Sequence, residues 1–212
     1  MKDMPLFATE YGIASLTLSN IPYTKAAYIQ IQDSREPEQL VTECRDFCVA
    51  VGAESVYANG HTCLEIYPHH TAVLELERSK YDLPFTSAVL SEVSENNMER
   101  WREIYWNRMR NVYNAAYISK SDMQKYLIQG KCYFVVLEGK EIGIGMVKDN
   151  EIIVVASMLP GMGQDVVLAL SKQISGEKIK VTVADQNKPA MRLYEQLGFQ
   201  CANVVANWYK IN

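Results

Sequence analysis

The stretch that decides the fold runs Val183-Ala-Asp-Gln-Asn-Lys-Pro-Ala-Met-Arg-Leu-Tyr-Glu-Gln-Leu-Gly-Phe199. Apolar and polar residues alternate over 179–184, which is the period of a strand with one apolar face. Asn187 can cap the helix that follows, and Pro189 falls in its first turn, where a missing N–H costs nothing. Four residues at i, i+3, i+4 and i+7 share one face of this helix: Ala190, Leu193, Tyr194 and Leu197. Gly198 suits the left-handed residue after a helix, so the stretch predicts a buried strand, a short amphipathic helix and a sharp stop.

The order Asn-x-Pro-Ala-x-Arg-Leu-Tyr-Glu-x-Leu-Gly-Phe over 187–199 closely resembles the last helix motif of the GNAT acyltransferase superfamily. Members of that superfamily move an acyl group from coenzyme A to an amine. The resemblance covers roughly residues 84–212 and implies an α+β fold, with a mixed, mostly antiparallel central sheet flanked by helices. It also implies acetyl-CoA as the co-substrate.

Residues 84–212 show hydrophobic patterns in the element order of that superfamily. We expect strands at 88–93, 132–138, 141–148, 151–158 and 179–184, helices at 98–112, 121–130, 165–174 and 188–197, and a closing strand or hairpin at 199–211. Asn96 or Asn97 is the expected cap of the first helix, and Ser121 that of the second.

Residues 1–83 predict an N-terminal αβ extension. A strand around 27–31 and a helix ending at Gly52 precede two strand-like runs in 62–77, which Pro68 separates. The same order occurs at 179–211, so one interpretation is a degenerate half copy of the acyltransferase unit. No Gly/Ser-rich linker lies at 79–86, and we therefore expect the two parts to pack together.

The composition excludes several classes of protein. A hydrophobic fraction of 48% and a charged fraction of 22% are ordinary for a globular protein. A net charge of −4 without a basic run argues against nucleic-acid binding. No apolar run approaches the ~20 residues of a membrane span, and the first residues lack a signal-peptide core. With an odd count of 5 Cys in no disulfide-framework spacing, the chain is expected to be cytoplasmic.

The loop Pro160-Gly-Met-Gly-Gln-Asp165 lies between a buried strand and a helix, where N–H groups and the helix dipole attract an anion. It resembles the family's Gln/Arg-x-x-Gly-x-Gly/Ala loop, with Gly163 at the fourth position. The resemblance implies that the cofactor is bound by Gly161, Met162, Gly163, Gln164 and Asp165. Pro160 and Asp165 depart from the family pattern, and Asp165 would place a carboxylate near the phosphates. The alternative is an ordinary strand-to-helix loop with Asp165 as the helix N-cap.

Other cofactor contacts follow from the resemblance. Ile153 and Val155 fall on the family's cofactor-pairing positions, where a free strand edge would bond the pantetheine arm. Asn187 matches the Asn that contacts the pantetheine amide, and Arg192 would reach the phosphates. Tyr194 matches the Tyr placed near the sulfur, which implies a general acid. Each of these residues also has a plainer alternative. Ile153 and Val155 would belong to a core strand and Asn187 would only cap a helix. Arg192 would be a solvated charge and Tyr194 a core aromatic.

No motif identifies the general base. Glu151 opens the strand that would face the cofactor, and Glu138 ends a neighbouring strand. Family members often use a Glu in this region, frequently through water, and on that resemblance we assign Glu151; a strand-end Glu is otherwise simply solvated. The first helix and the connection after it are rich in aromatic rings, of which some would shape an amine pocket while several, at helical spacing, must be core: Trp101, Tyr105, Trp106, Tyr113 and Tyr117.

The 3 His and three of the 5 Cys fall between Cys44 and His70, which invites a zinc interpretation. The spacing argues against it. Cys44 and Cys48 share an apolar helix face, where a free Cys behaves as a small hydrophobe. His61-x-Cys63 and His69-His70 match no common zinc pattern, so no metal is predicted.

The resulting hypothesis is an N-acetyltransferase that transfers an acetyl group from acetyl-CoA to a primary amine by direct attack in a ternary complex. The acceptor stays open. Family members often pair through their last strands, which makes a homodimer an expectation. The rival is a non-catalytic acyl-CoA-binding or interaction module with a degenerate GNAT site, which the departures at Pro160 and Asp165 favour.

Overall fold

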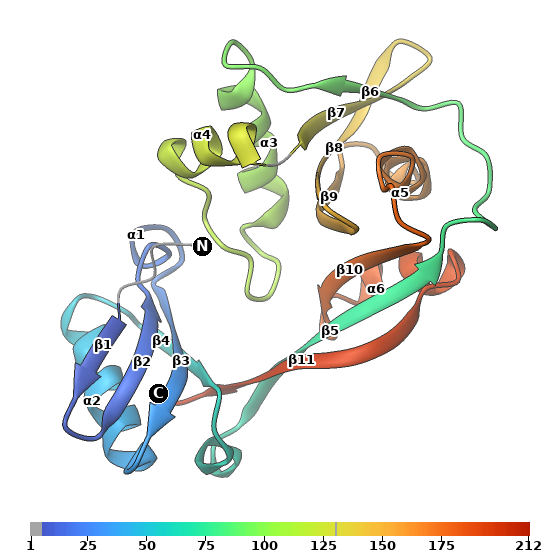
Figure 1. Cartoon of the computed structure of the whole chain (residues 1–212). Helices are drawn as coiled ribbons and strands as arrows, with labels where there is room; N and C mark the ends of the chain where they lie inside the picture. The colour runs from blue at the N-terminus through green and yellow to red at the C-terminus, as the bar shows by residue number, and fades with distance from the viewer. Residues whose placement is uncertain (1–5, 130) are drawn as a thin grey trace. The chain divides into compact units, whose positions relative to one another are not determined.

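The computed structural model describes residues 6–129 and 131–212 (Figure 1). These residues form two compact units. Unit 1 consists of the described residues up to Val73 together with Val204–Asn212, and unit 2 consists of Leu74–Asn203. Two long strands, β5 (His69–Ser79) and β11 (Gln200–Lys210), each begin in one unit and end in the other.

Unit 1 is a sheet covered by one long helix. Its elements are β1 (Leu6–Thr9), β2 (Gly12–Thr17), α1 (Ile21–Thr24), β3 (Ala26–Ser34), α2 (Pro37–Ala50), β4 (Ser55–Asn59) and the 3-10 helix η1 (Thr62–Ile66). The strands lie in the order β1-β2-β3-β4, and the end of β11 pairs with β4. The core lies between this sheet and α2, where Leu40, Val41, Cys44 and Cys48 are buried. One of the two strand-like runs in 62–77 was wrong, because His61 Nδ1 accepts a hydrogen bond from Cys63 N–H and starts η1 instead.

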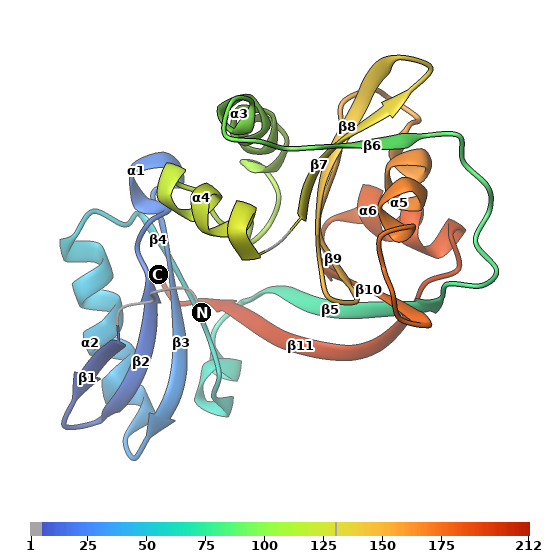
Figure 2. The same cartoon turned by 45° about the horizontal axis from the view of Figure 1, so that its top comes forward.

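Unit 2 has helices on both faces of its sheet (Figure 2). Its elements are β6 (Val89–Glu92), α3 (Met98–Met109), α4 (Lys120–Gln129), β7 (Lys131–Leu137), β8 (Lys140–Lys148), β9 (Glu151–Ser157), α5 (Gly163–Ser171), β10 (Lys178–Ala184) and α6 (Lys188–Gln196). The strand order is β5-β10-β9-β8-β7-β6. One core cluster lies under α5 and α6, and a second lies under α3 and α4. The predicted α+β class with a mostly antiparallel sheet is confirmed.

Two glycines let α5 approach the sheet closely. A Cβ added at Gly145 on β8 would lie 2.3 Å from Cδ1 of Leu170, and one at Gly143 would lie 2.5 Å from Cγ2 of Val166. Each residue therefore has to be glycine for the helix to lie where it does. This packing fixes α5, and with it the N-terminus of α5, against the strand pair β8–β9.

Some predicted details differ from the structure. The cap of α4 is Ser119 and not Ser121, because Ser119 Oγ accepts from Asp122 N–H at 3.1 Å while Asp122 Oδ2 accepts from Ser119 N–H at 3.1 Å. Asn97 precedes α3, but its Oδ1 accepts from Ser94 N–H instead of capping the helix. The closing segment is one strand, β11, and not a hairpin.

The two units share a topology. Each has three consecutively paired antiparallel strands, a helix, and a strand parallel to the third: β1-β2-β3-α2-β4 in unit 1 and β7-β8-β9-α5-β10 in unit 2. The sequence had suggested a half copy from the order of elements at 179–211 alone. The shared topology covers more elements than that and supports the interpretation of a half copy, which stays a prediction.

The strand that follows each repeated segment in the chain completes the sheet of the other segment. The neighbour of β10 in unit 2 is β5, which follows the first segment in the chain. The neighbour of β4 in unit 1 is β11, which follows the second. The predicted domain boundary between residues 83 and 84 marks where the acyltransferase unit begins in the sequence, and it stays a prediction. The compact units of the structure divide at different points, 73/74 and 203/204.

Candidate functional site

Strands β9 and β10 form a fork. They pair in parallel at only two positions among the described residues, Lys180 with Glu151 and Val181 with Ile152. Beyond Ile152, β9 continues to Ser157 and stays paired with β8, while its other edge has no strand partner in the part of the chain that the structure describes. An unpaired edge offers backbone N–H and C=O groups to an extended ligand.

A β-bulge lies where the fork opens. The β8–β9 register passes from Val147 opposite Ile152 to Met146 opposite Val154, and so skips Ile153. The bulge also reverses which side chains face which core: Ile152 belongs to the cluster under α5 and α6, whereas Val154 belongs to the one under α3 and α4. A bulge bends its strand, so it accounts for the separation of β9 from β10. It leaves Ile153 41% exposed.

The predicted phosphate loop is built from the N-terminus of α5. Its first helical bond runs from Val166 N–H to Met162 O, and the N–H groups of Gly163, Gln164 and Asp165 have no partner among the described residues. Gly161 has a φ of 82°, and no atom lies within 4 Å of where its Cβ would be. This arrangement is suited to an anion.

Gly163 has a packing role as well. A Cβ at this position would lie 3.1 Å from Cδ2 of Leu193 on α6. The loop therefore lies directly against α6.

The carboxylate of Asp165 does not cap the helix; it accepts a hydrogen bond from Thr86 Oγ1 at 2.7 Å. Thr86 is 3% exposed, and its hydroxyl oxygen also accepts from Ala88 N–H. Lys172, at the other end of α5, donates to the carbonyls of Thr86 and Ala88. The unusual Asp at this position thus holds the segment before β6, and only its backbone N–H is left for the loop.

Helix α6 carries the residues that resemble the family motif. Asn187 Oδ1 accepts from Ala190 N–H at 3.3 Å, so Asn187 is a helix cap. Gln196 Oε1 accepts a long hydrogen bond of 3.5 Å from Gln164 Nε2. Arg192 is four residues from Gln196 and therefore on the same face of the helix, toward the loop. The Arg192 side chain is exposed and forms no ion pair with a described residue. Gln196 is a neighbour of the loop that sequence reasoning missed, because its amide carries no motif.

Tyr194 is buried, at 6% exposed, and its ring meets the ring of Phe199 edge-on with centroids 5.4 Å apart. Its hydroxyl has no hydrogen-bond partner among the residues that the structure describes. Burial raises the pKa of the phenol above its usual range, so the group is protonated at neutral pH. It is both a core aromatic and a proton donor without a protein acceptor.

Glu151 lies at the closed end of the fork. Its Oε1 accepts a hydrogen bond from Thr182 Oγ1 at 2.7 Å, which ties β9 to β10 just beyond their last backbone pair. Glu138, the other candidate base, lies in the turn between β7 and β8 with a φ of 51°, is exposed, and is not on the fork. The structure brings Glu151, but not Glu138, to the strands that form the fork.

The predicted amine-pocket aromatics divide into two groups. Trp101 and Tyr105 are core residues, with their polar atoms bonded to the carbonyls of Tyr133 and Ala116. Trp106 and Tyr117 meet edge-on with centroids 5.2 Å apart, and Tyr113 is 45% exposed. Of the five rings, only those of this second group are partly open to solvent.

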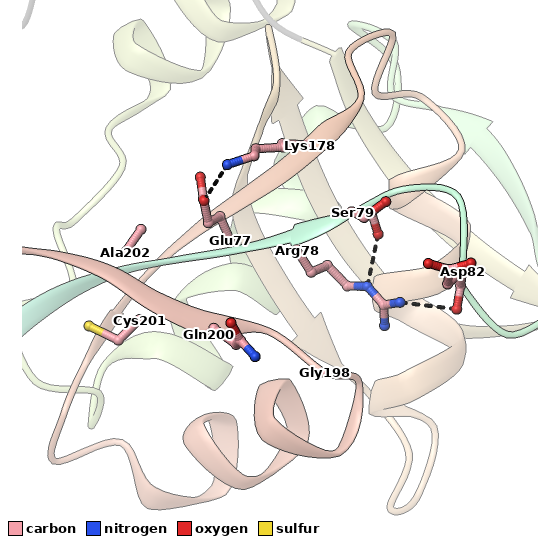
Figure 3. Close-up of a pocket in the computed structure, with 9 residues that line it drawn as sticks. All are labelled: Glu77, Arg78, Ser79, Asp82, Lys178, Gly198, Gln200, Cys201 and Ala202. Carbon is pink, nitrogen blue, oxygen red and sulfur yellow. Dashed lines mark hydrogen bonds and ion pairs between the residues drawn. The ribbon is translucent and has the colours of Figure 1, made fainter.

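A pocket of about 370 Å³ lies elsewhere in unit 2 (Figure 3). It is lined by Glu77, Arg78, Ser79, Asp82, Lys178, Gly198, Gln200, Cys201 and Ala202. The Arg78 side chain donates to the carbonyls of Ser79 and Asp82. None of these is a predicted site residue, so the pocket is separate from the fork.

Cys44 and Cys48 of unit 1 are apolar core residues, and Cys63 is partly buried. Burial raises the pKa of Cys44 to about 12 and that of Cys48 to about 11, which disfavours the thiolate that a metal requires. Within the described residues no group of three or more His, Cys, Asp or Glu is placed to hold a metal ion. No helix of the described part of the chain has the length and apolarity needed to cross a membrane.

Residues 159–208, which include the loop, α5, β10 and α6, match the model of a family described as FR47-like protein. The chain is similar to a GCN5-related N-acetyltransferase from Kribbella flavida, with a TM-score of 0.60, 14% identity and coverage of 98% of this chain and 88% of that one. The chain has the GNAT fold.

Two further structures with this likeness cover most of both chains. A conserved protein from Staphylococcus epidermidis described as functionally unknown has a TM-score of 0.61 and 10% identity, over 99% of this chain and 94% of that one. A tandem GNAT protein from the clavulanic acid biosynthesis pathway, without AcCoA, has a TM-score of 0.56 and 11% identity, over 94% and 78%. No curated protein matches the chain in sequence.

Proposed function

We propose that this GNAT fold is an N-acetyltransferase that transfers an acetyl group from acetyl-CoA to a primary amine by direct attack in a ternary complex. The observation that carries the proposal is the fork between β9 and β10, with the free N–H groups of the loop beyond it. The fork leaves an open strand edge for an extended arm, and the loop attracts an anion at one end of that edge.

The first repeated segment serves as an internal comparison. Strands β3 and β4 pair over five positions, from Ala26 with Ser55 to Gln30 with Asn59, and form no fork. Where unit 2 has free loop N–H groups, the N–H groups of Arg35 and Glu36 donate to the carbonyl of Tyr11. The same topology is thus closed in unit 1 and open in unit 2, which favours a ligand in unit 2 alone.

The cofactor would bind through three features of unit 2. The N–H groups of Gly161, Gly163 and Gln164, supported by Arg192, would hold the pyrophosphate. The edge of β9 at Ile153 and Val155 would bond the pantetheine arm, and the side-chain NH₂ of Asn187, which has no described partner, would face it. Asp165 would contribute through its backbone N–H, and Met162, whose N–H donates to the Leu159 carbonyl, through the shape of the loop.

In the reaction the amine nitrogen forms a bond to the thioester carbonyl carbon, and the carbon–sulfur bond breaks. Tyr194 donates its phenolic proton to the departing thiolate, for which its unpartnered hydroxyl is suited. Glu151 accepts the proton that the nitrogen loses, directly or through water. A backbone N–H at the bulge would polarise the carbonyl.

The test is thiol release from acetyl-CoA across a panel of primary amines, together with calorimetric titration of coenzyme A. Turnover that saturates in both substrates supports the proposal. Binding of coenzyme A without turnover of any amine would instead support the non-catalytic binding module. Absence of binding would overturn both. The expected homodimer is a separate prediction, which sedimentation measures.

A further inference from the structure

One row of charged side chains crosses the closed end of the fork. On β10, Lys180 stands opposite Glu151 of β9 in the strand register. On its other side Lys180 Nζ lies 3.0 Å from Glu75 Oε1, and Glu75 belongs to β5. Neighbouring strands are about 4.8 Å apart, so Lys180 has a carboxylate residue on the strand at each side, Glu75 on β5 and Glu151 on β9.

The three side chains share one face of the sheet. Leu76, Val181 and Ile152, the next residues along each strand, all belong to the core under α5 and α6. Glu75, Lys180 and Glu151 therefore point to the opposite face. They are all within unit 2.

The two carboxylates have different partners. Glu75 accepts a hydrogen bond from the ammonium group of Lys180, whereas Glu151 accepts one from the neutral hydroxyl of Thr182 at 2.7 Å. The pKa of Lys180 is raised, first by its hydrogen bond to Glu75 and then by the charge of Glu75, with Glu77 and Glu151 contributing less. Lys180 is thus paired with Glu75.

This arrangement matters for a base. A positive charge beside a carboxylate favours its ionised form and makes it a weaker proton acceptor. If Lys180 turned to Glu151, it would weaken the group that has to take the proton from the amine.

We infer that Glu75 is a positioning residue that holds Lys180 away from Glu151, so that Glu151 keeps its capacity to accept a proton. The inference rests on the proposed function, in which Glu151 is the base. It also assigns a chemical role to β5, the strand that follows the first repeated segment and completes the sheet of the second.

The kinetic test uses Glu75→Gln, which removes the charge and keeps the shape. We expect kcat to fall at least about tenfold, with the affinity for coenzyme A unchanged, because Lys180 pairs with Glu151 instead. Lys180→Met in the same background should restore kcat to within about threefold of wild type, since it removes the competing charge. Lys180→Met alone should stay within about threefold of wild type.

A matched control is Glu77→Gln. Glu77 pairs with Lys178, one rung farther along the same two strands and not opposite Glu151. It should leave kcat within about threefold of wild type. Equal losses from Glu75→Gln and Glu77→Gln, or no restoration by Lys180→Met, would overturn the inference.

A second measurement needs no turnover, so it separates failure of this inference from failure of the proposed function. The rate of Lys180 acylation by dilute acetic anhydride, read by mass spectrometry, reports how much of the amine is unprotonated. If Lys180 turns to Glu151 in the Glu75→Gln variant, it keeps a carboxylate partner, and its acylation rate should change by less than about threefold. In the double variant Glu75→Gln with Glu151→Gln both partners are lost. The acylation rate should then rise about tenfold for each unit by which the pKa of Lys180 falls. An equal rise in the single and double variants would show that Lys180 does not turn to Glu151. Wild type without turnover, but with the expected labelling pattern, would refute the proposed function and keep the electrostatic arrangement.

Discussion

The substitution Tyr194→Phe should separate the two roles of this residue, because it keeps the ring and removes only the hydroxyl. The ring is 6% exposed and packs against Phe199, so the variant should fold. A hydrogen bond contributes roughly 0.5–1.5 kcal/mol to stability, and this hydroxyl makes none with a described residue, so Phe removes no such bond. Its removal should therefore leave the free energy of unfolding unchanged or raise it by up to about 1 kcal/mol.

Turnover should fall in the Tyr194→Phe variant, although stability does not. A positioned general acid contributes typically ~10²–10⁴-fold to the rate, so we expect a loss of at least about tenfold, or about 1.4 kcal/mol in the activation barrier. Because burial raises the pKa of the phenol, the wild-type group keeps its proton at neutral and mildly alkaline pH. The affinity for acetyl-CoA should change little.

The assay has two parts. Single-turnover thiol release at saturating amine measures the chemical step, and urea unfolding measures stability. A Phe variant that turns over at the wild-type rate would refute the assignment of Tyr194 as the acid, because water would then protonate the thiolate. A Phe variant that loses stability by more than about 1 kcal/mol would refute the interpretation that the hydroxyl has no partner in the free protein.

Three other predictions concern the fold. Gly145→Ala should destabilise the protein by about 1–3 kcal/mol in urea unfolding, because the added Cβ would lie 2.3 Å from Leu170; a change below about 0.5 kcal/mol would contradict this packing. A fragment of residues 84–212 lacks β5 beside β10 and should give no cooperative thermal transition in circular dichroism, whereas a transition like that of the full chain would show that β5 is dispensable. The thiol of Cys48 has its pKa raised in the folded state, so folding stability should be complete below about pH 9 and fall as pH rises toward 11; Cys48→Ala should flatten that decline, and an unchanged slope would contradict the shift.

Local patterns predicted most elements, since their causes lie within a few residues. The helix at 188–197 needs only its cap, its proline and one apolar face, and the structure has Lys188–Gln196 with Asn187 as the cap. One prediction failed because a side chain next to the run competes with strand formation. The run at 62–66 has strand-forming residues, but the His61 side chain starts a 3-10 turn there.

The candidate site was predicted in the same uneven way. The resemblance of the motif and the loop to the family led to Asn187, Tyr194 and Gly163, whereas caps, glycines and helix phase alone are equally those of a plain core helix and its loop. Glu151 could be named but not supported, since its partner Thr182 is on another strand. The role of Asp165 could not be foreseen, because Thr86 lies 79 residues away in the chain.

The sequence by itself determined most elements of residues 84–212, their order and the family that the last helix resembles, because hydrophobic period, caps and glycines act over short distances. Only the tertiary structure decided which strand lies beside β10, where β9 leaves it, and which carboxylate Lys180 meets. A strand's backbone can pair with any other strand, so its own residues do not name its neighbour. That choice depends on the packing of the whole chain, and the chemistry at the fork depends on that choice.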